Sequence, residues 1–299
     1  MPLYYIDRMT GEKTLEKIEG DRCLKWLYGT QVGGTTLELI IKRKIPTVVY
    51  GKYQDTKHSR KKIKKMIMKH KMDSSEFEKE IISYTSFNDF FARKLKPEAR
   101  PIDEAINVLI SPADGRVLAY ENIQMNEVVQ VKGLTYTLSD LFQDNALSNK
   151  YQEGVCVIVR LSPVDYHRFH YPDSGKVIGQ RQIKGHFYSV NPIALKEIID
   201  LYVKNKREYT IFDSEHFGQI VMMEVGATCV GSIIQHHEKG FYARKGLEKG
   251  YFKFGGSTVM LFFEKEMVKI DSDIITNTLK GFETKVKMGE KIGLKIEPC

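Results

Sequence analysis

The spacing of apolar and polar residues changes near residue 95. Before that point, apolar residues mostly recur at helical spacing, and Ile63, Met66, Ile67 and His70 form a narrow stripe at i, i+3, i+4 and i+7. Ser86 stands three residues before an acid, which fits a capping box at the start of a short helix. The first 95 residues are therefore predicted to be mainly helical.

Beyond Pro97 and Pro101 the chain contains short runs rich in β-forming residues, separated by glycine and proline. These runs are Val108–Ile110, Arg116–Ala119, Val155–Leu161, Gln219–Val225, Val230–Ile234 and Val259–Phe263. One helix, Pro192–Val203, is expected to interrupt them. The pattern predicts an α+β protein, with a helical region over residues 1–95 and a mostly β body, a mixed sheet or sandwich, over residues 96–299.

Composition places the chain among globular proteins. Its 299 residues are 42% hydrophobic and 28% charged, which excludes a disordered or fibrous chain. Four widely separated cysteines show neither metal-ligand nor CxxC spacing, so reduced thiols in a cytosolic compartment are expected. No apolar run approaches the ~18 residues of a spanning helix, and the first residues do not resemble a secretory signal. The chain is expected to be soluble or to lie on a membrane without crossing it.

The net charge of +8 is concentrated in one segment, Lys57–Lys71, which holds eight Lys or Arg and no acid. Such a segment favours an anionic partner, either a nucleic acid or a lipid surface. On a membrane, the lysines would attract anionic headgroups while Leu24, Trp26, Leu27 and Ile40 enter the interface. The alternative is that the apolar residues pack on the β body and the lysines face solvent.

The segment Tyr251–Phe263, YFKFGGSTVMLFF, is a strand pattern interrupted by two glycines and a serine. A β-bulge is one interpretation. The other is self-cleavage, in which the Ser257 hydroxyl attacks the carbonyl of Gly256, a residue without an obstructing Cβ. The amide would become an ester, elimination across Ser257 would break the chain, and hydrolysis of the dehydroalanine would leave an N-terminal pyruvoyl group. That ketone is an electron sink for amine substrates.

A serine hydroxyl needs a base to take its proton. The segment Leu161–Pro172, LSPVDYHRFHYP, offers His167 and His170, which share one side of a helical turn but point to opposite faces of a strand. One structural and one exposed histidine is the alternative, and a metal pair lacks a third ligand, so no metal is expected. Asp114 in SPADGRV can orient a base, although Asp-Gly between strands is also an ordinary turn.

Six motifs, in this order along the chain, resemble the phosphatidylserine decarboxylase proenzyme family. They are SPADGRV (Ser111–Val117), QVKG (Gln130–Gly133), LSPVDYHRFHYP (Leu161–Pro172), FYSVN (Phe187–Asn191), GATCVGSI (Gly226–Ile233) and GYFKFGGST (Gly250–Thr258). The segment SFNDFFARKLKPEARPID resembles the family's lead-in, and YYIDRMTGEK and LKWLYG resemble its clostridial-type branch. Many members carry Leu-Gly-Ser-Thr at the cleavage point, whereas this chain carries the Gly-Gly-Ser-Thr variant.

The resemblance implies a cut between Gly256 and Ser257, which gives a β chain of residues 1–256 and an α chain of residues 257–299. It implies that Ser257 becomes a covalent pyruvoyl cofactor, that Asp114 and His170 form a protease-like triad with it, and that His167 acts in decarboxylation. Phosphatidylserine would be converted to phosphatidylethanolamine through an imine, in phospholipid biosynthesis. Either His167 or His170 is expected to protonate the product, because histidine titrates near working pH.

The family also implies a peripheral enzyme on the cytoplasmic side of the cell membrane, often a homodimer, with phosphatidylserine and an anionic lipid surface as partners. One alternative is a pyruvoyl decarboxylase of a soluble amino acid, which would not need a basic amphipathic N-terminal region. Another is a non-catalytic nucleic-acid-binding module. Only Lys57–Lys71 supports that module, and the segment lacks the interleaved aromatic residues of a stacking platform, so no nucleic acid is expected.

Overall fold

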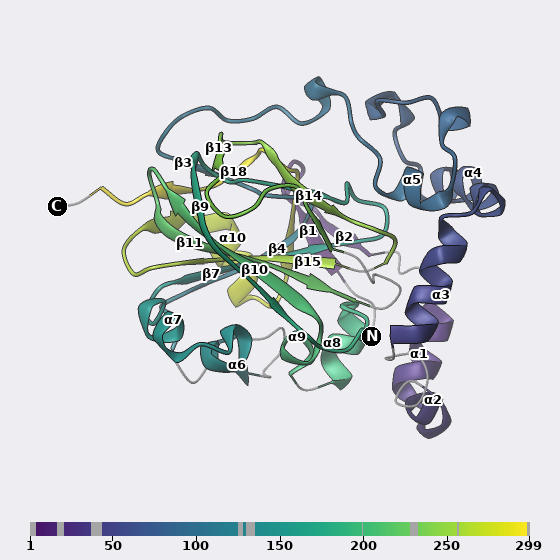
Figure 1. Cartoon of the computed structure of the whole chain (residues 1–299), viewed down its shortest axis with the longest axis horizontal. Coiled ribbons are helices and arrows are strands. Elements are labelled where there is room, and N and C mark those ends of the chain that lie inside the picture. The colour runs from purple at the N-terminus through teal and green to yellow at the C-terminus, as the bar shows by residue number, and fades with distance from the viewer. Residues whose placement is uncertain are drawn as a thin grey trace.

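A ten-stranded mixed sheet forms the centre of the protein in a computed structural model (Figure 1). The structure describes residues 4–16, 21–36, 44–124, 128–129, 135–198, 200–227, 233–255 and 257–297. In spatial order the strands are β13 (Tyr242–Ala243), β9 (Gly175–Ile183), β10 (Arg207–Ser214), β11 (Gly218–Gly226), β15 (Ser257–Phe263), β7 (Val155–Leu161), β4 (Gly115–Glu121), β17 (Glu283–Val286), β1 (Tyr4–Asp7) and β2 (Lys13–Leu15). Neighbouring strands are antiparallel except β1 and β17, which are parallel.

Smaller sheets and short helices surround this sheet. The additional strands are β12 (Ile233–Gln235), β14 (Glu248–Phe252) and β8 (Arg168–His170) in one sheet, β16 (Val268–Ile270), β18 (Lys291–Lys295) and β3 (Val108–Ile110) in another, and β5 (Val128–Val129) with β6 (Thr135–Tyr136). The α-helices are α1 (Asp21–Gly29), α2 (Gln31–Thr36), α3 (Lys44–Gln54), α4 (Lys61–His70), α5 (Phe87–Phe91), α6 (Leu138–Phe142), α7 (Asn145–Lys150), α8 (Pro192–Glu197), α9 (Leu201–Lys204) and α10 (Ser272–Leu279). The 3₁₀ helices are η2 (Lys57–Arg60), η3 (Ser74–Glu76), η4 (Ile81–Ser83) and η5 (Pro97–Ala99).

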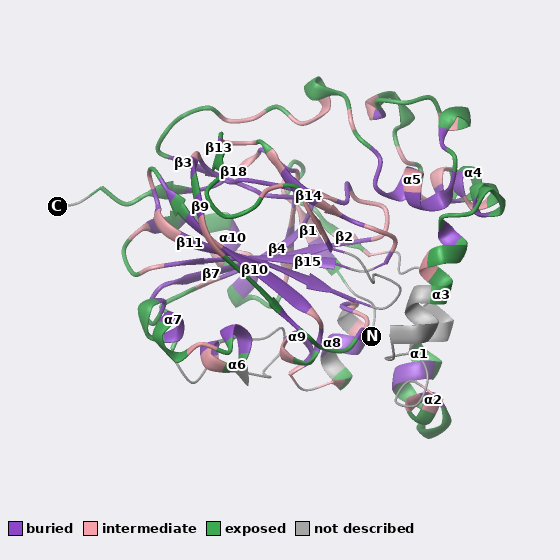
Figure 2. Ribbon diagram, in the orientation of Figure 1, coloured by how far each residue is buried: buried purple, intermediate pink, exposed green. Residues whose placement is uncertain are grey.

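Both faces of the central sheet are covered, which explains its uninterrupted apolar strands. Every residue of β7 and β15 is buried (Figure 2). Ile158 and Met260 belong to a core that includes residues of α6 to α9, whereas Val159 and Leu261 belong to a second core that includes residues of β8, β14 and β18. Strands buried on both faces are continuously hydrophobic instead of alternating. The predicted α+β architecture with a large mixed sheet is therefore confirmed.

Two elements differ from the sequence prediction. Residues 4–15, which were expected to be helical, form the hairpin β1–β2, because β1 pairs in parallel with β17 from the other end of the chain. The single helix predicted over 192–203 is two short helices, α8 and α9. Asp200 between them has a left-handed φ of 58°, a conformation that an α-helix does not contain.

The helices α1 to α5 lie at one end of the sheet (Figure 1). The apolar stripe of α4 is largely internal: Ile63 and Met66 are buried in a cluster with Phe87, Phe90 and Phe91 of α5. The predicted cap of α5 is present, since Ser86 Oγ accepts a hydrogen bond from the Asp89 N–H at 3.1 Å. The stripe is therefore buried inside the protein, but mainly against α5 and not on the β body as the alternative had it.

The four apolar residues predicted to enter a membrane have different surroundings. Leu27 is buried, whereas Trp26 is exposed. Ile40 and the side chain of Leu24 lie outside the described residues. Within the described ranges, no helix combines the length and the apolar character needed to cross a bilayer.

Candidate active site

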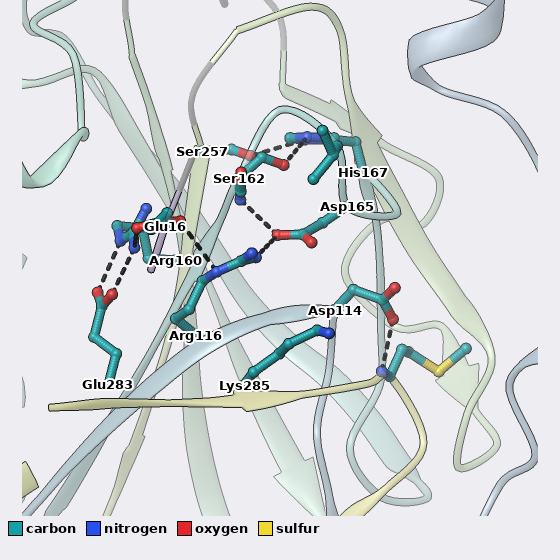
Figure 3. A network of polar contacts seen from close by, with 12 residues as sticks. Glu16, Asp114, Arg116, Arg160, Ser162, Asp165, His167, Ser257, Glu283 and Lys285 are labelled. Atoms are coloured by element: carbon teal, nitrogen blue, oxygen red, sulfur yellow. Dashed lines mark hydrogen bonds and ion pairs between the residues drawn. The ribbon is translucent and has the colours of Figure 1, made fainter. Parts of the chain in front are cut away.

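Ser257 is hydrogen-bonded to His167 (Figure 3). Ser257 is the buried first residue of β15, where it pairs with Leu161 of β7 and Gly226 of β11. Its Oγ lies 3.1 Å from His167 Nδ1, and His167 Nε2 lies 3.0 Å from the carbonyl oxygen of Ser162. Because a carbonyl oxygen can only accept, Nε2 carries the ring proton and Nδ1 is free to accept from the serine hydroxyl. The Ser257 hydroxyl is therefore hydrogen-bonded to a ring nitrogen that can accept its proton.

The surroundings of His167 keep its ring neutral. Burial lowers the pKa of His167 to about 3; Arg93 adds to this shift and Asp165 opposes it. The imidazole stacks on the ring of Phe91, with 3.9 Å between centroids and an interplanar angle of 29°. A neutral imidazole is the form that can accept a proton, and the lowered pKa keeps His167 in that form at neutral pH.

The loop that presents His167 is fixed by Asp165. This buried carboxylate accepts the Ser162 N–H at 2.6 Å and an additional short hydrogen bond from Arg116 Nη1. Burial alone would raise the pKa of Asp165, but the interaction with Arg116 outweighs burial and the pKa is lowered. Asp165 therefore stays ionised and holds Ser162, whose carbonyl in turn orients His167.

A buried ion network extends from Asp165 across the sheet (Figure 3). Arg116 of β4 forms a 3.1 Å ion pair with Glu16, which also lies 2.6 Å from Arg160 of β7. Arg160 then pairs with Glu283 of β17 at 2.5 Å. Burial would lower the pKa of Arg160, but these two carboxylates hold it well above its ordinary value. The sequence does not identify Ser162, Arg116 or Glu16 as part of the site, because their pairing depends on strand register.

Asp114 and His170 lie near this site without bonding to Ser257. Asp114, immediately before β4, accepts hydrogen bonds from Arg100 at 2.6 and 2.8 Å and from the Met288 N–H at 2.8 Å. His170 is buried at the end of β8; its Nδ1 has no hydrogen-bond partner among the residues that the structure describes, and burial lowers its pKa to about 4. Among the described residues, no hydrogen bond joins Asp114, His170 and Ser257. The triad remains a prediction, whereas the Ser257–His167 contact is observed.

The glycines before Ser257 are described only in part. Gly256 lies outside the described residues. Gly255 has a φ of 145°, which residues with a Cβ rarely adopt. The backbone conformation therefore requires a glycine at position 255, independently of the chemistry at Ser257.

A cavity of about 360 Å³ adjoins the loop of residues 162–166. Its lining includes Arg93, Arg100, Asp114, Arg116 and Asp165. Arg93 donates from Nη2 to the carbonyls of residues 164 and 165 at 2.9 and 3.0 Å and lies over two phenylalanine rings.

In the described part of the chain, no group of three His, Cys, Asp or Glu residues could hold a metal ion. The chemistry of the site is thus that of a buried serine, a neutral histidine and nearby arginines.

Comparisons with known proteins match this chain over most of its length. The family model described as phosphatidylserine decarboxylase matches residues 87–294, which include Asp114, His167, His170 and Ser257. The phosphatidylserine decarboxylase proenzyme of Clostridium novyi (strain NT) is 54% identical over 282 residues, covering 94% of this chain and 96% of that protein. The proenzymes of Clostridium botulinum (strain Alaska E43) and Clostridium perfringens (strain ATCC 13124) are 52% and 51% identical, over 97% of this chain and 98% of each relative.

Proposed function

Since the chain belongs to the phosphatidylserine decarboxylase family, we propose that the site around Ser257 carries out both the autocatalytic maturation of the proenzyme and the decarboxylation that follows. The enzyme is a carboxy-lyase of phospholipid biosynthesis that converts phosphatidylserine into phosphatidylethanolamine and CO₂. The observation that carries the assignment of the site is the 3.1 Å contact between Ser257 Oγ and His167 Nδ1.

Maturation begins at the Ser257 hydroxyl. Its oxygen gives up a proton and attacks the carbonyl carbon of Gly256, the bond from that carbon to the Ser257 nitrogen breaks, and the nitrogen takes a proton. The product is an ester between the two residues. Loss of the Ser257 Cα proton then expels the Gly256 carboxylate, and water replaces the nitrogen of residue 257, which leaves as ammonia. His167 is placed to accept the first proton; His170 with Asp114 is the pair that the family resemblance implies.

The surroundings of Ser257 fit a covalent pyruvoyl group at this position. Residue 257 is fully buried and is paired on both sides, with Leu161 and Gly226, so a new chain end would stay in place after the cut. A pyruvoyl group supplies an electrophilic carbonyl that binds the substrate amine and takes the electron pair released with CO₂. His167 Nδ1 faces residue 257, so a proton carried there is delivered at that residue. Phe91 shields the stacked face of the imidazole from water.

The rate of maturation should be nearly constant between about pH 8 and pH 5. Both candidate bases are buried and have lowered pKa values, about 3 for His167 and about 4 for His170, so each stays neutral over this range. An ordinary histidine would gain a proton near pH 6.5 and the rate would fall below that pH. The measurement is the first-order rate at which the α chain appears, by intact mass, in freshly translated precursor. A rate that halves near pH 6.5 would show that the base is not buried.

Substrate choice tests the assigned reaction directly. The family match and the named relatives favour phosphatidylserine over the two alternatives, a soluble amino acid and a nucleic acid. The matured protein is expected to release CO₂ from vesicles that contain phosphatidylserine and none from free serine. Release from free serine at an equal rate would contradict the assignment.

We further propose that the helices α1 to α4 hold the enzyme on an anionic membrane surface, as a peripheral protein on the cytoplasmic side. Supporting this, α4 exposes the lysines Lys61, Lys64, Lys65 and Lys69, and the exposed apolar side chains of α1 to α4 include Trp26, Val32, Val49, Tyr50, Tyr53 and Met68. Basic and apolar groups on one region of a surface suit adsorption at the headgroup boundary. A homodimer, implied by the resemblance, stays a prediction.

The triple variant Lys61→Gln, Lys64→Gln, Lys65→Gln should bind anionic vesicles about 10²-fold more weakly, because each basic residue near the surface contributes about 1 kcal/mol. Trp26 is the single tryptophan of the chain and is 45% exposed, so its emission reports contact with lipid. We expect a shift to shorter wavelength on phosphatidylserine vesicles, reversed by high salt. The control makes the same charge change at the exposed Lys176, Lys239 and Lys295. Equal binding by the two triple variants would contradict a specific role for α4.

A further inference from the structure

The short helix α5 contacts both the segment before the proposed cleavage point and the histidine that is hydrogen-bonded to Ser257. Asn88 Oδ1 accepts a hydrogen bond at 2.8 Å from the N–H of Phe254, two residues before Gly256. Three residues further along α5, Phe91 stacks on His167. We propose that α5, acting through Asn88, positions the scissile segment for self-cleavage. The inference rests on the proposed function of Ser257 and adds a positioning residue to it.

The segment before the scissile bond is held by the N-terminal helices. The ring of Phe254 lies 5.1 Å from those of Phe87 and Phe91, in edge-to-face geometry, and 6.0 Å from that of Tyr50 in α3. Such aromatic pairs stabilise by about 0.5–1.5 kcal/mol beyond the area they bury. Ser257, in contrast, is held by the central sheet. Phe254 and Ser257, which lie on either side of the proposed cleavage point, are therefore held by two different parts of the fold.

The side-chain amide of Asn88 has only one orientation that satisfies its neighbours. Its Nδ2 donates to Asp55 Oδ1 at 2.9 Å and to the carbonyl of Gly51 at 3.2 Å. Both of these groups are acceptors, so the nitrogen must face them and the oxygen must face the Phe254 N–H. Asn88 is buried, and its position is specified by three hydrogen bonds from two other segments.

The helix that carries Asn88 is itself fixed at its first turn. The Phe87 N–H donates to Ser59 Oγ at 2.8 Å. The single Ser59 hydroxyl proton lies between two carbonyl acceptors, that of Thr56 at 2.7 Å and that of Gln54, the last residue of α3, at 2.9 Å. Asp89 Oδ2 accepts the Thr85 N–H at 2.8 Å. Because α5 is held at its first turn, Asn88 has a fixed position from which it binds the N–H of Phe254. Asn88 touches neither the nucleophile nor the base, so its role is to place the scissile segment.

The first test is the maturation rate of Asn88→Ala, followed by the intact mass of the α chain. We expect a rate about 10- to 10²-fold lower than in the wild-type chain, since a displacement of about 1 Å can have that effect on a reaction between positioned groups. Asn149→Ala, which removes an exposed amide on α7, should mature at the wild-type rate. Each variant is also made with Ser257→Ala, so that the thermal stability of the uncut chain is measured separately.

The second test exchanges the two hydrogen-bonded residues. Asn88→Asp places a carboxylate against Asp55 and should mature as slowly as Asn88→Ala. Adding Asp55→Asn gives the carboxylate at position 88 a donor and keeps its acceptor for the Phe254 N–H, while the longer contact with the Gly51 carbonyl stays without a proton, so a partial recovery over Asn88→Asp is expected. A general loss of packing would not be reversed by this exchange, which makes the recovery specific to positioning.

The outcomes separate this proposal from the function on which it rests. Wild-type maturation rates in Asn88→Ala and Asn88→Asp would overturn the role of Asn88 while leaving the cleavage intact. If Asn88→Ala with Ser257→Ala melts far below Ser257→Ala alone, the exchange pair decides, and lack of recovery there overturns the proposal. Failure of the wild-type chain to mature would instead contradict the proposed function of Ser257.

Discussion

Replacing Ser257 with alanine will leave one uncut chain of 34.5 kDa with no measurable decarboxylase activity. Alanine lacks the oxygen that attacks residue 256, so neither the ester nor the later ketone can form. The change removes one buried hydrogen bond, to His167, and leaves a small side chain between β7 and β11. The variant is therefore expected to fold, and the loss is chemical in origin.

The control for this experiment is Ser272→Ala, which removes an exposed serine hydroxyl at the start of α10, within the same predicted α chain. It should mature fully. Intact mass distinguishes one chain from two, and the shorter product should lack a free N-terminal amine. Cleavage and turnover in Ser257→Ala would refute the assignment of this serine.

Replacing His167 with alanine should lower turnover per matured molecule by about 10²- to 10⁴-fold, the range that a positioned acid or base contributes. His167 is the titratable side chain hydrogen-bonded to residue 257, and its tautomer is fixed by the carbonyl of Ser162. His167→Asn is the matched variant, because an amide atom near the former Nδ1 keeps a hydrogen-bonding group there but cannot carry the proton. His58→Ala, at an exposed histidine of η2, should retain activity. Turnover close to wild type in both His167 variants would exclude this residue from proton transfer.

The maturation rates of the same variants decide between two candidate bases. If His167 takes the Ser257 proton, His167→Ala will accumulate as precursor and His170→Ala will mature. If the triad implied by the family resemblance operates, His170→Ala and Asp114→Asn will accumulate and His167→Ala will mature. The second result would require His170 and Asp114 to rearrange, since Asp114 is bonded to Arg100 and the Met288 N–H in the structure.

The sequence predicts the central strands well because their apolar runs are continuous. Val155–Leu161 and Val259–Phe263 lie within β7 and β15. Because these strands are buried on both faces, their residues are continuously apolar, and such short apolar runs predict strands. The hairpin β1–β2 was not predictable in this way. Tyr4–Asp7 is a short segment, and its strand conformation depends on β17, nearly the whole chain away.

The choice between the two histidines also lay beyond the sequence. Their spacing allows either one to face Ser257, and the outcome depends on where the loop ends and β8 begins. In the structure β8 starts at Arg168, so His167 is the last loop residue, where Asp165 and Ser162 orient it. Asp165 pairs with Arg116 of β4, and Arg116 pairs in turn with Glu16 of the N-terminal segment, so only the folded chain brings these residues together.

The position of β15 in the middle of the sheet has a consequence for reversibility. After cleavage, the shorter chain would still supply β15, β16, α10, β17 and β18, while β1 of the longer chain pairs with β17. The two products would be interleaved, so a denatured mature enzyme must reassemble by a bimolecular encounter, whereas the uncut precursor refolds as a single molecule. Recovery after denaturation should therefore depend on protein concentration only once the chain has been cut. Folding must precede the cut, and a mature molecule that unfolds in dilute solution is lost.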